Sequence, residues 1–173
     1  RIRFLLEVVA AVRDAVGADF PVWCKLDSRE VGKEGGLTIE EAIWNAQQVE
    51  AAGVDAICVT AYHDTDQPKL HSGSHTPHVP GLNIPFAARI KAAVRVPVIA
   101  SGRIEPEVAD RAIADGKLDF VAMGRKMLAD PHLPRKLAEG RPRDVLPCIY
   151  CYTCISAIYM NASARCAVNP ATG

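Results

Sequence analysis

The sequence carries no excess of charge of either sign. Its 20 lysine and arginine residues balance 20 aspartate and glutamate residues, and the isoelectric point is near 7.1. A neutral chain has no electrostatic basis for binding nucleic acid or an anionic membrane, so we expect neither as a partner. No apolar run in the sequence reaches the roughly 18 residues that a membrane-spanning helix requires.

The sequence also lacks an initiator methionine and a signal peptide, because its first four residues lead directly into a helical pattern. We therefore expect a segment of a longer chain. With 173 residues, 49% of them hydrophobic, it can bury the core of one domain. Two of its six cysteines, Cys24 and Cys58, stand alone in strand-like apolar runs and are interpreted as buried, inert thiols. Free thiols favour the reducing cytoplasm as the location.

Hydrophobic periodicity predicts an α/β protein with a parallel sheet. The predicted helices cover 1–16, 38–52, 84–94 and 106–114, with short pieces over 126–139, and the predicted strands cover 20–26, 56–61, 96–100 and 119–123. Thr38 and Glu41 fit a capping box, and 27–36 reads as a polar loop. The strands are apolar throughout, as in sheets that are buried on both faces. Four such βα units correspond to half of a (β/α)8 TIM barrel, whose complete form needs about 200 residues.

A four-stranded half of a barrel has two open edges, here the strands that begin near Phe20 and Asp119. The side chains that we expect to face the barrel axis are Val22, Ile57, Val59, Val98 and Val121. They would need partner side chains from the missing half of the barrel or from another chain. We therefore do not expect the 173-residue segment to be a stable free monomer.

Four cysteines follow the last predicted strand in the pattern C-x2-C-x2-C-x11-C. They are Cys148, Cys151, Cys154 and Cys166. Three thiolates within seven residues do not spread easily around one small ion, but a tight loop can direct them to three corners of an iron–sulfur cube. Bacterial ferredoxins use the same C-x2-C-x2-C run for a 4Fe–4S cluster, and Cys166 is the obvious fourth ligand. Structural zinc is the main alternative, although zinc sites more often pair two C-x2-C knuckles across a longer gap, and an unmetallated or disulfide arrangement also stays open.

Two consecutive predicted strands are each followed by glycine and arginine at the start of a helical segment, as Gly102-Arg103 and Gly124-Arg125. Barrels gather function at the C-terminal ends of their strands and often place a phosphate site after the last two. Glycine lets a phosphate approach the backbone N–H groups, and the helix N-terminus favours its negative charge. Arginine adds a planar fork for the phosphate oxygens. The paired turns therefore predict a phosphate site.

Lys25 and His63 also stand at predicted strand ends. Lys25 is either a surface lysine or a cation beside an electron-rich cofactor ring, and His63 is either an ordinary loop histidine or a proton donor. The irregular stretch 62–83 is long enough to be a functional loop. Its other histidines are His71, His75 and His78. We discount a metal site there, because the flanking Gly, Ser, Thr and Pro residues do not align these side chains on a helix.

Several stretches together resemble the old yellow enzyme family. They are Val96 to Ile104 (VPVIASGRI), Asp119 to Arg125 (DFVAMGR), Leu128 to Pro131 (LADP) and the cysteine run. The resemblance is closest to the iron–sulfur branch that contains bacterial 2,4-dienoyl-CoA reductase and trimethylamine dehydrogenase. Members of that branch have an FMN-bearing TIM barrel, a 4Fe–4S cluster just after it, and usually C-terminal domains that bind FAD and NAD(P)H. The resemblance implies a half-barrel on the FMN-phosphate side over 1–140, and a cluster segment with the start of a linker over 141–173.

The resemblance also implies roles for single residues. It places the FMN phosphate at Ser101-Gly102-Arg103 and at Gly124-Arg125, and it assigns the cluster to the four cysteines of the run. Lys25 stands where the family has an arginine or lysine near N1 and O2 of the flavin. His63 resembles the active-site histidine, within Tyr-His-Asp in place of Trp-His-Glu. The family's first four βα units, which carry residues around the FMN ring and a tyrosine that helps protonate substrate, have no counterpart here.

The function that the resemblance implies is that of a fragment of an FMN- and 4Fe–4S-dependent oxidoreductase. Electrons would pass from NAD(P)H through FAD and the cluster to FMN, which would reduce an activated C=C bond of the enoate or 2,4-dienoyl-CoA type, with His63 helping the proton. The isolated segment is expected to be inactive, and the complete protein to be a homo-oligomer acting on a small-molecule substrate. Two alternatives stay open: an amine dehydrogenase of the trimethylamine type, and a non-catalytic α/β module that holds structural zinc.

Overall fold

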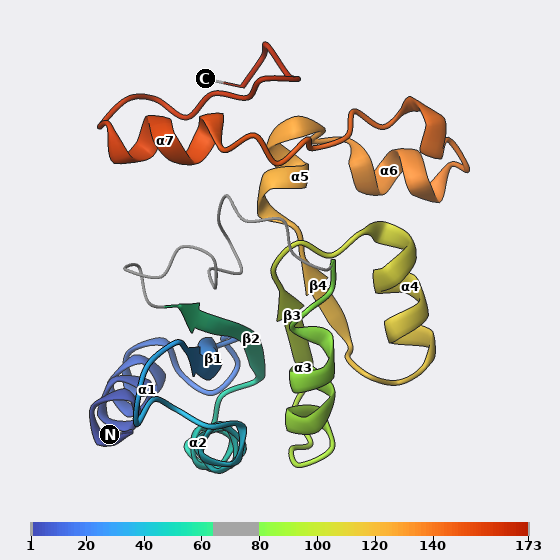
Figure 1. Ribbon diagram of the computed structural model, residues 1–173. Coiled ribbons are helices and arrows are strands. Elements are labelled where there is room, and N and C mark those ends of the chain that lie inside the picture. The colour runs from blue at the N-terminus through green and yellow to red at the C-terminus, as the bar shows by residue number, and fades with distance from the viewer. Residues whose placement is uncertain (1, 64–79, 173) are drawn as a thin grey trace. The chain divides into compact units, whose positions relative to one another are not determined.

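One parallel sheet organises the first part of the chain. The computed structural model describes residues 2–63 and 80–172, without the side chains of Tyr62 and His63. The strands are β1 (Trp23–Val31), β2 (Ala56–His63), β3 (Val98–Ser101) and β4 (Phe120–Ala122), and they pair in parallel in the order β1-β2-β3-β4. The helices of this part are α1 (Arg3–Val16), α2 (Ile39–Ala51), α3 (Ile84–Lys91) and α4 (Pro106–Ala114) (Figure 1). The predicted α/β class and parallel sheet are confirmed. His71, His75 and His78, for which we discounted a metal site, lie outside the described residues.

Local signals place the helices where the sequence predicts them. Thr38 caps α2, and Glu41 returns a hydrogen bond to the Thr38 backbone, which confirms the capping box. Pro106 opens α4, where its missing N–H removes no helical hydrogen bond. A contact that no local pattern predicts joins α1 to the sheet: Arg13 donates hydrogen bonds to Asp55 Oδ2 at 2.7 Å and to Phe20 O at 2.7 Å. This guanidinium fixes the entrance of β1 against the entrance of β2.

We expected five side chains to face the barrel axis, on the side of the sheet away from the helices, and this prediction was wrong for three of them. Ile57, Val59 and Val98 are all fully buried, on the face of the sheet to which α2 and α3 contribute contacts. The opposite face carries a row in register, namely Lys25, Cys58, Ile99 and Phe120. Phe120 in that row is 57% exposed. Strands that are apolar throughout show no alternation, so their sequence could not reveal which face the helices would cover.

Strand β1 is longer than the sequence predicts. It continues through the polar residues 27–30 to Val31, a segment that we expected to form a loop, and its pairing with β2 shifts register between Asp27 and Glu30. The Glu30 carboxylate accepts a hydrogen bond from Leu37 N at 2.7 Å, and Glu30 N donates to Leu37 O at 3.0 Å. Pairing with the extended β2 thus overrides the low strand propensity of this segment.

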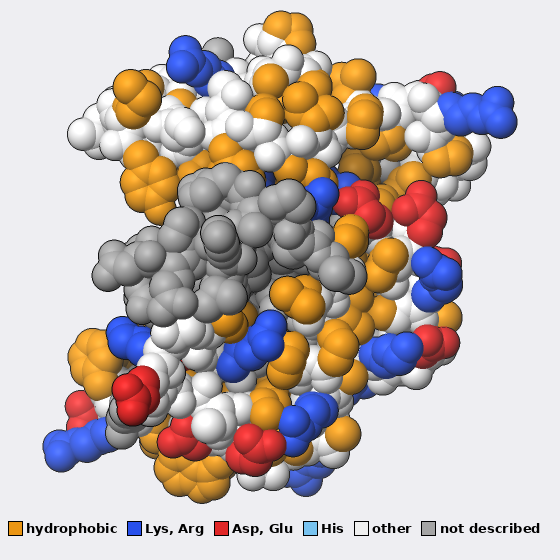
Figure 2. All heavy atoms as spheres, in the orientation of Figure 1, with side chains coloured by type: hydrophobic (Ala, Val, Ile, Leu, Met, Phe, Trp, Pro, Cys, Tyr) orange, Lys and Arg blue, Asp and Glu red, His pale blue; other side chains and the backbone are white. Residues whose placement is uncertain are grey.

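The last part of the chain forms a second compact unit. The units comprise Arg1–Ala122 and Met123–Gly173, which differs from the functional boundary expected after residue 140; that boundary stays a prediction. The helices of the second unit are α5 (Gly124–Ala129), α6 (Leu133–Ala138), the 3-10 turn η2 (Pro142–Asp144) and α7 (Thr153–Tyr159). Its surface carries large apolar side chains, among them Ile149, Ile158 and Met160 (Figure 2). Over the described ranges of both units, no helix has the length and apolarity needed to cross a membrane.

Candidate functional site

The cysteine-bearing segment is tied to helix α5 on both sides of its four cysteines. Before them, the backbone N–H of Leu146 donates to Asp130 Oδ2 at 2.9 Å, just beyond the end of α5. After them, Asn169 Nδ2 and Thr172 Oγ1 donate to the carbonyl of Leu128 at 2.9 and 2.8 Å. The last carbonyls of a helix have no partner within the helix, so side chains from a later segment can satisfy them. Hydrogen bonds to α5 and to its last residues therefore anchor both ends of the segment 146–172.

Asp130 is the polar centre of this arrangement. It is 1% exposed, and it accepts hydrogen bonds from Lys136 Nζ at 2.7 Å and from His132 N at 3.0 Å, besides the one from Leu146 N. The hydrogen bond from Lys136, followed by those from the two backbone N–H groups, lowers the pKa of Asp130 to about 2 although burial opposes the shift. A buried carboxylate with three donors is satisfied and stays charged near neutral pH.

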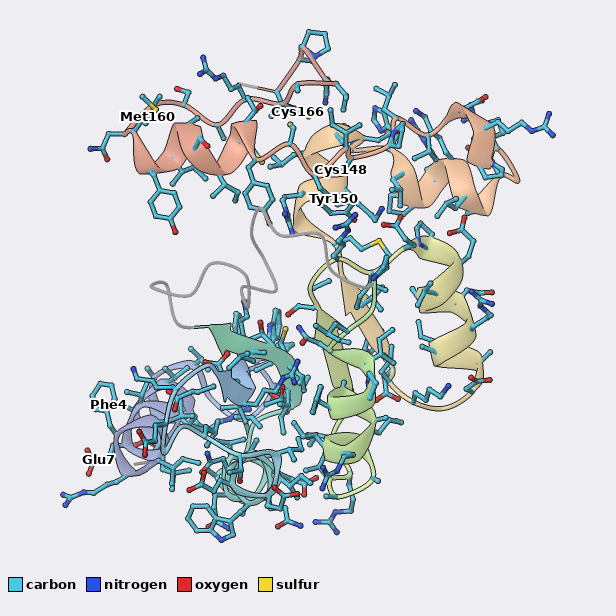
Figure 3. All side chains as sticks on the ribbon, viewed as in Figure 1. Phe4, Glu7, Cys148, Tyr150, Met160 and Cys166 are labelled. Carbon is cyan, nitrogen blue, oxygen red and sulfur yellow. The ribbon has the colours of Figure 1, made fainter. Side chains whose placement is uncertain are left out.

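All four cysteines of the predicted cluster motif line a single pocket. Besides the thiols, this pocket is lined by Arg125 and Leu128 of α5 and by Tyr150 and Tyr152. Figure 3 labels Cys148, Tyr150 and Cys166, which lie beside α5. Helix α7 begins between the second and third cysteines, and Cys154 is buried in it. The sequence did not predict this short helix.

The thiols differ in their surroundings. Cys151 is exposed, and its Sγ lies 3.3 Å from Thr153 Oγ1; hydrogen bonds from the side chain and then the backbone of Thr153 lower the pKa of this thiol. A lowered pKa favours the thiolate, which is the form that binds soft metals. Among the residues that the structure describes, no three Cys, His, Asp or Glu side chains converge closely enough to hold one metal ion.

Two tyrosines contact Arg125 from the stretch 148–154, which holds the first three cysteines and is called the cysteine loop below. The guanidinium carbon lies 5.1 Å from the ring centre of Tyr150 and 5.0 Å from that of Tyr152. Both tyrosines have left-handed backbone angles, with φ of 53° and 65°. Such a conformation costs a residue other than glycine about 1–3 kcal/mol. A cation–π contact contributes about 0.5–2 kcal/mol, so the contacts with Arg125 offset part of that cost.

The other Gly-Arg turn follows β3. Gly102 has φ of 100°, and a Cβ there would lie 3.0 Å from Asn83 Nδ2. That amide donates to Ser101 O at 2.9 Å, while the Ser101 hydroxyl donates to Val59 O at 3.0 Å. Only glycine fits such a backbone without strain. At Gly124, by contrast, a Cβ would meet nothing within 4 Å among the described residues.

The remaining predicted residues lie in the first unit. Lys25 is exposed on β1, directly opposite Cys58 in the register of the sheet. His63 is the last residue of β2, so its backbone stands at the predicted strand end, and its side chain falls outside the described residues. Cys24 is half-buried, and burial raises the pKa of its thiol to about 11, which agrees with an inert thiol. Cys58 is buried as predicted.

Sequence reasoning missed four residues that shape these features: Asn83, Asp130, Tyr150 and Tyr152. Asp130 stands in an Asp-Pro pair that reads as an ordinary turn, because its partners lie up to sixteen residues away. Asn83 precedes a predicted helix, which suggests a cap, yet its side chain makes no capping hydrogen bond and binds the β3 turn instead. The tyrosines gave no signal, because bulky residues rarely adopt positive φ.

Comparison with known proteins places these features in a family. The model of the NADH:flavin oxidoreductase / NADH oxidase family matches residues 1–144. Among curated relatives, NADH oxidase from Thermoanaerobacter brockii is 40% identical over 176 residues and cinnamate reductase from Clostridium sporogenes is 37% identical over 191. Each alignment covers 100% of this chain but only 27% and 28% of the relative, so the chain spans about a quarter of their length.

Solved structures of proteins with related sequences are also similar to this chain. A 2-naphthoyl-CoA reductase in complex with 2-naphthoyl-CoA superimposes with a TM-score of 0.88 at 35% identity, covering 97% of this chain and 26% of that one. Histamine dehydrogenase from Rhizobium sp. 4-9 superimposes with a TM-score of 0.85 at 29% identity, covering 99% and 24%. The resemblance to the old yellow enzyme family is thereby confirmed. The chain belongs to the NADH:flavin oxidoreductase / NADH oxidase family.

Proposed function

We propose that this chain supplies the FMN-phosphate and iron–sulfur part of a flavin-dependent oxidoreductase. The observation that carries the proposal is the pocket that four cysteines share with Arg125, immediately after a parallel sheet of this family. We propose that the sheet is the C-terminal half of a TIM barrel over 1–140, that 141–173 binds the cluster, and that the complete protein is cytoplasmic and homo-oligomeric.

The donor set of the pocket fits a 4Fe–4S cluster. Cysteine thiolates are the ligands that such clusters use, and Cys148, Cys151, Cys154 and Cys166 would hold it. All four thiols line one pocket, so they can serve together as the ligands of a single cluster. When bound, such a cluster supplies one-electron transfer.

Each Gly-Arg turn, taken by itself, has features of a phosphate contact. Within the described residues, Arg125 Nη1 is buried and has no hydrogen-bond partner, so one donor is left for an acceptor from outside. The open space at Gly124 would let an oxygen approach the backbone. Gly102, directly before Arg103, adopts the positive φ that this turn requires. Charge-assisted hydrogen bonds to phosphate are among the strongest in proteins, so these groups would hold FMN by its phosphate.

FMN, when bound, supplies hydride-transfer chemistry. Lys25, exposed on the sheet face opposite the helix-covered one, would present its ammonium group to the flavin and favour the negative charge of the reduced ring. His63, at the end of β2, would hold a proton for the substrate, since histidine changes charge near neutral pH.

Two substrate classes fit the family, and they differ in the direction of electron flow. A cinnamate reductase and a 2-naphthoyl-CoA reductase are among the similar proteins, and so is a histamine dehydrogenase. We propose the first class, in which NAD(P)H, acting through an FAD domain elsewhere in the protein, supplies electrons and an activated C=C bond receives them. NADH oxidase at 40% and cinnamate reductase at 37% identity stand above an N,N-dimethylglycine/sarcosine dehydrogenase at 34%, and this modest difference supports that direction.

An anaerobic titration of the full-length protein tests the direction. We expect NADH or NADPH to bleach the flavin and an α,β-unsaturated carboxylate or thioester to restore its colour. Trimethylamine and histamine should leave the oxidised flavin unchanged. Bleaching by an amine, without bleaching by either nicotinamide, would replace the reductase with the amine dehydrogenase alternative.

A further inference from the structure

Arg125 is held by the loop that carries the cysteines. Its guanidinium carbon lies 5.1 Å from the ring centre of Tyr150 and 5.0 Å from that of Tyr152. These tyrosines alternate with the cysteines, because Tyr150 precedes Cys151 and Tyr152 follows it. The same short loop therefore sets the positions of the thiols and of the two rings.

We propose that Tyr150 and Tyr152 are positioning residues for Arg125, which hold its guanidinium ready for the FMN phosphate. The cysteine loop would then set the affinity of the neighbouring flavin site. This inference rests on the proposed role of Arg125 as a phosphate ligand.

The nature of the contact supports a positioning role. A ring face attracts the guanidinium as a cation, so the contact restrains the side chain without requiring its N–H groups as donors. Within the described part of the chain, Nη1 of Arg125 remains buried with no hydrogen-bond partner. A long side chain that is restrained before binding loses less conformational entropy when the ligand arrives. The rings thus fix the guanidinium and leave it a donor for a phosphate oxygen.

The backbone of the loop supports the same conclusion. Tyr150 and Tyr152 have φ of 53° and 65°, a region where bulky residues are rare. Strained conformations persist where the surroundings require them, and they cluster at functional sites. Here both rings contact Arg125 in the wall of the pocket that the four cysteines line, and the Tyr150 ring also lies 5.4 Å from Lys126 Nζ. Because binding effects are reciprocal, a loop ordered by its cluster would tighten FMN, and bound FMN would steady the loop.

The test compares FMN with riboflavin, which lacks the phosphate, in full-length protein stripped of flavin but retaining its iron. Tyr152→Leu removes the ring while keeping a side chain at the strained position, and Tyr152→Phe keeps the ring as the matched control. We expect Tyr152→Leu to weaken FMN about five-fold, from the usual strength of a cation–π contact, and to leave riboflavin unchanged. Tyr152→Phe should bind both flavins normally. Unchanged FMN binding in Tyr152→Leu, or equal losses for FMN and riboflavin, would overturn the inference.

Arg125→Ala separates this inference from the proposed function. If Arg125→Ala leaves the ratio of FMN to riboflavin affinity intact, the phosphate role itself is wrong, and the positioning role fails with it. If Arg125→Ala lowers the ratio and the tyrosine variants do not, only the positioning role fails. We expect Tyr152→Leu to have no further effect on FMN in the Arg125→Ala background, because coupled residues are not additive. Should Tyr152→Leu lose its iron, Tyr150→Leu replaces it, with Lys126→Met as the control for the second cation that the Tyr150 ring contacts.

Discussion

Asp130 accepts a hydrogen bond from the backbone N–H of Leu146 at 2.9 Å, across sixteen residues of sequence. Leu146 stands two residues before Cys148, so this contact fixes the entrance of the cysteine loop to the end of α5. Lys136 completes the arrangement by donating to Asp130 at 2.7 Å. Asp130, which is not among the residues that line the pocket of the four thiols, therefore helps to fix the backbone two residues before the first of them.

Asp130→Asn should loosen the cysteine loop. The substitution removes the buried charged acceptor and leaves the partly buried Lys136 without its counter-ion, which is costly. We expect faster release of iron to a chelator and faster hydrogen exchange at the amide of Leu146. Asp144→Asn is the matched control, since that carboxylate is half exposed and pairs with Arg141 at the surface. Equal iron release from the two variants would contradict the role of Asp130.

The same carboxylate gives the stability of the protein a pH dependence. The pKa of Asp130 is lowered to about 2 in the folded protein, against about 3.9 for an unfolded aspartate. The unfolded state therefore takes up a proton first, and the contribution of Asp130 to the free energy of unfolding is present above about pH 4 and lost as the pH falls toward 2. The difference in this free energy between the native protein and Asp130→Asn should shrink over that range in urea titrations. A difference that stays constant, or grows, would show that Asp130 is not held as a charged acceptor.

The two turn glycines should respond to alanine in opposite ways. Gly102→Ala forces a side chain to φ of 100° and brings its Cβ within 3.0 Å of Asn83 Nδ2. We expect a loss of about 1–3 kcal/mol in the free energy of unfolding. Gly124→Ala meets open space at the start of α5 and should be neutral or stabilising by up to about 1 kcal/mol. If a phosphate approaches Gly124 closely, Gly124→Ala should lose affinity for FMN although the protein stays stable. Its affinity for riboflavin, which lacks the phosphate, should stay at the native value.

Thermal unfolding and flavin titration of both variants check this pair. Equal stability of the two variants would show that the turn at Gly102 does not need glycine. Unchanged FMN binding in Gly124→Ala would remove the phosphate from that turn.

The parts of this fold that follow from sequence are those with local causes. The capping box at Thr38, the helix start at Pro106 and the parallel β2 and β3 all come from residues close in the chain. The extension of β1 could not be predicted, because pairing with β2 stabilises polar residues that read as a loop. The covered face of the sheet could not be predicted either, since apolar strands look alike on both faces.

The candidate site divides in the same way. The spacing of the cysteines predicted that they act together, and they do line one pocket. The anchors of that pocket escaped prediction, because Asp130 meets its partners through the fold and Tyr152 adopts an angle that its residue type disfavours. What sequence could supply was the chemistry of the thiols, and what it could not supply was the support that positions them.

Iron and acid-labile sulfide in anaerobically purified full-length protein test the central claim most directly. Cys154→Ser replaces a buried thiol of the pocket with a poor ligand for soft metals, whereas Cys24→Ser changes a thiol on β1 whose pKa burial raises to about 11. We predict about four irons and four sulfides per chain in the native protein and in Cys24→Ser, and loss of most of both in Cys154→Ser. Full iron and sulfide in both variants, or a colourless native protein with one zinc per chain, would contradict the account.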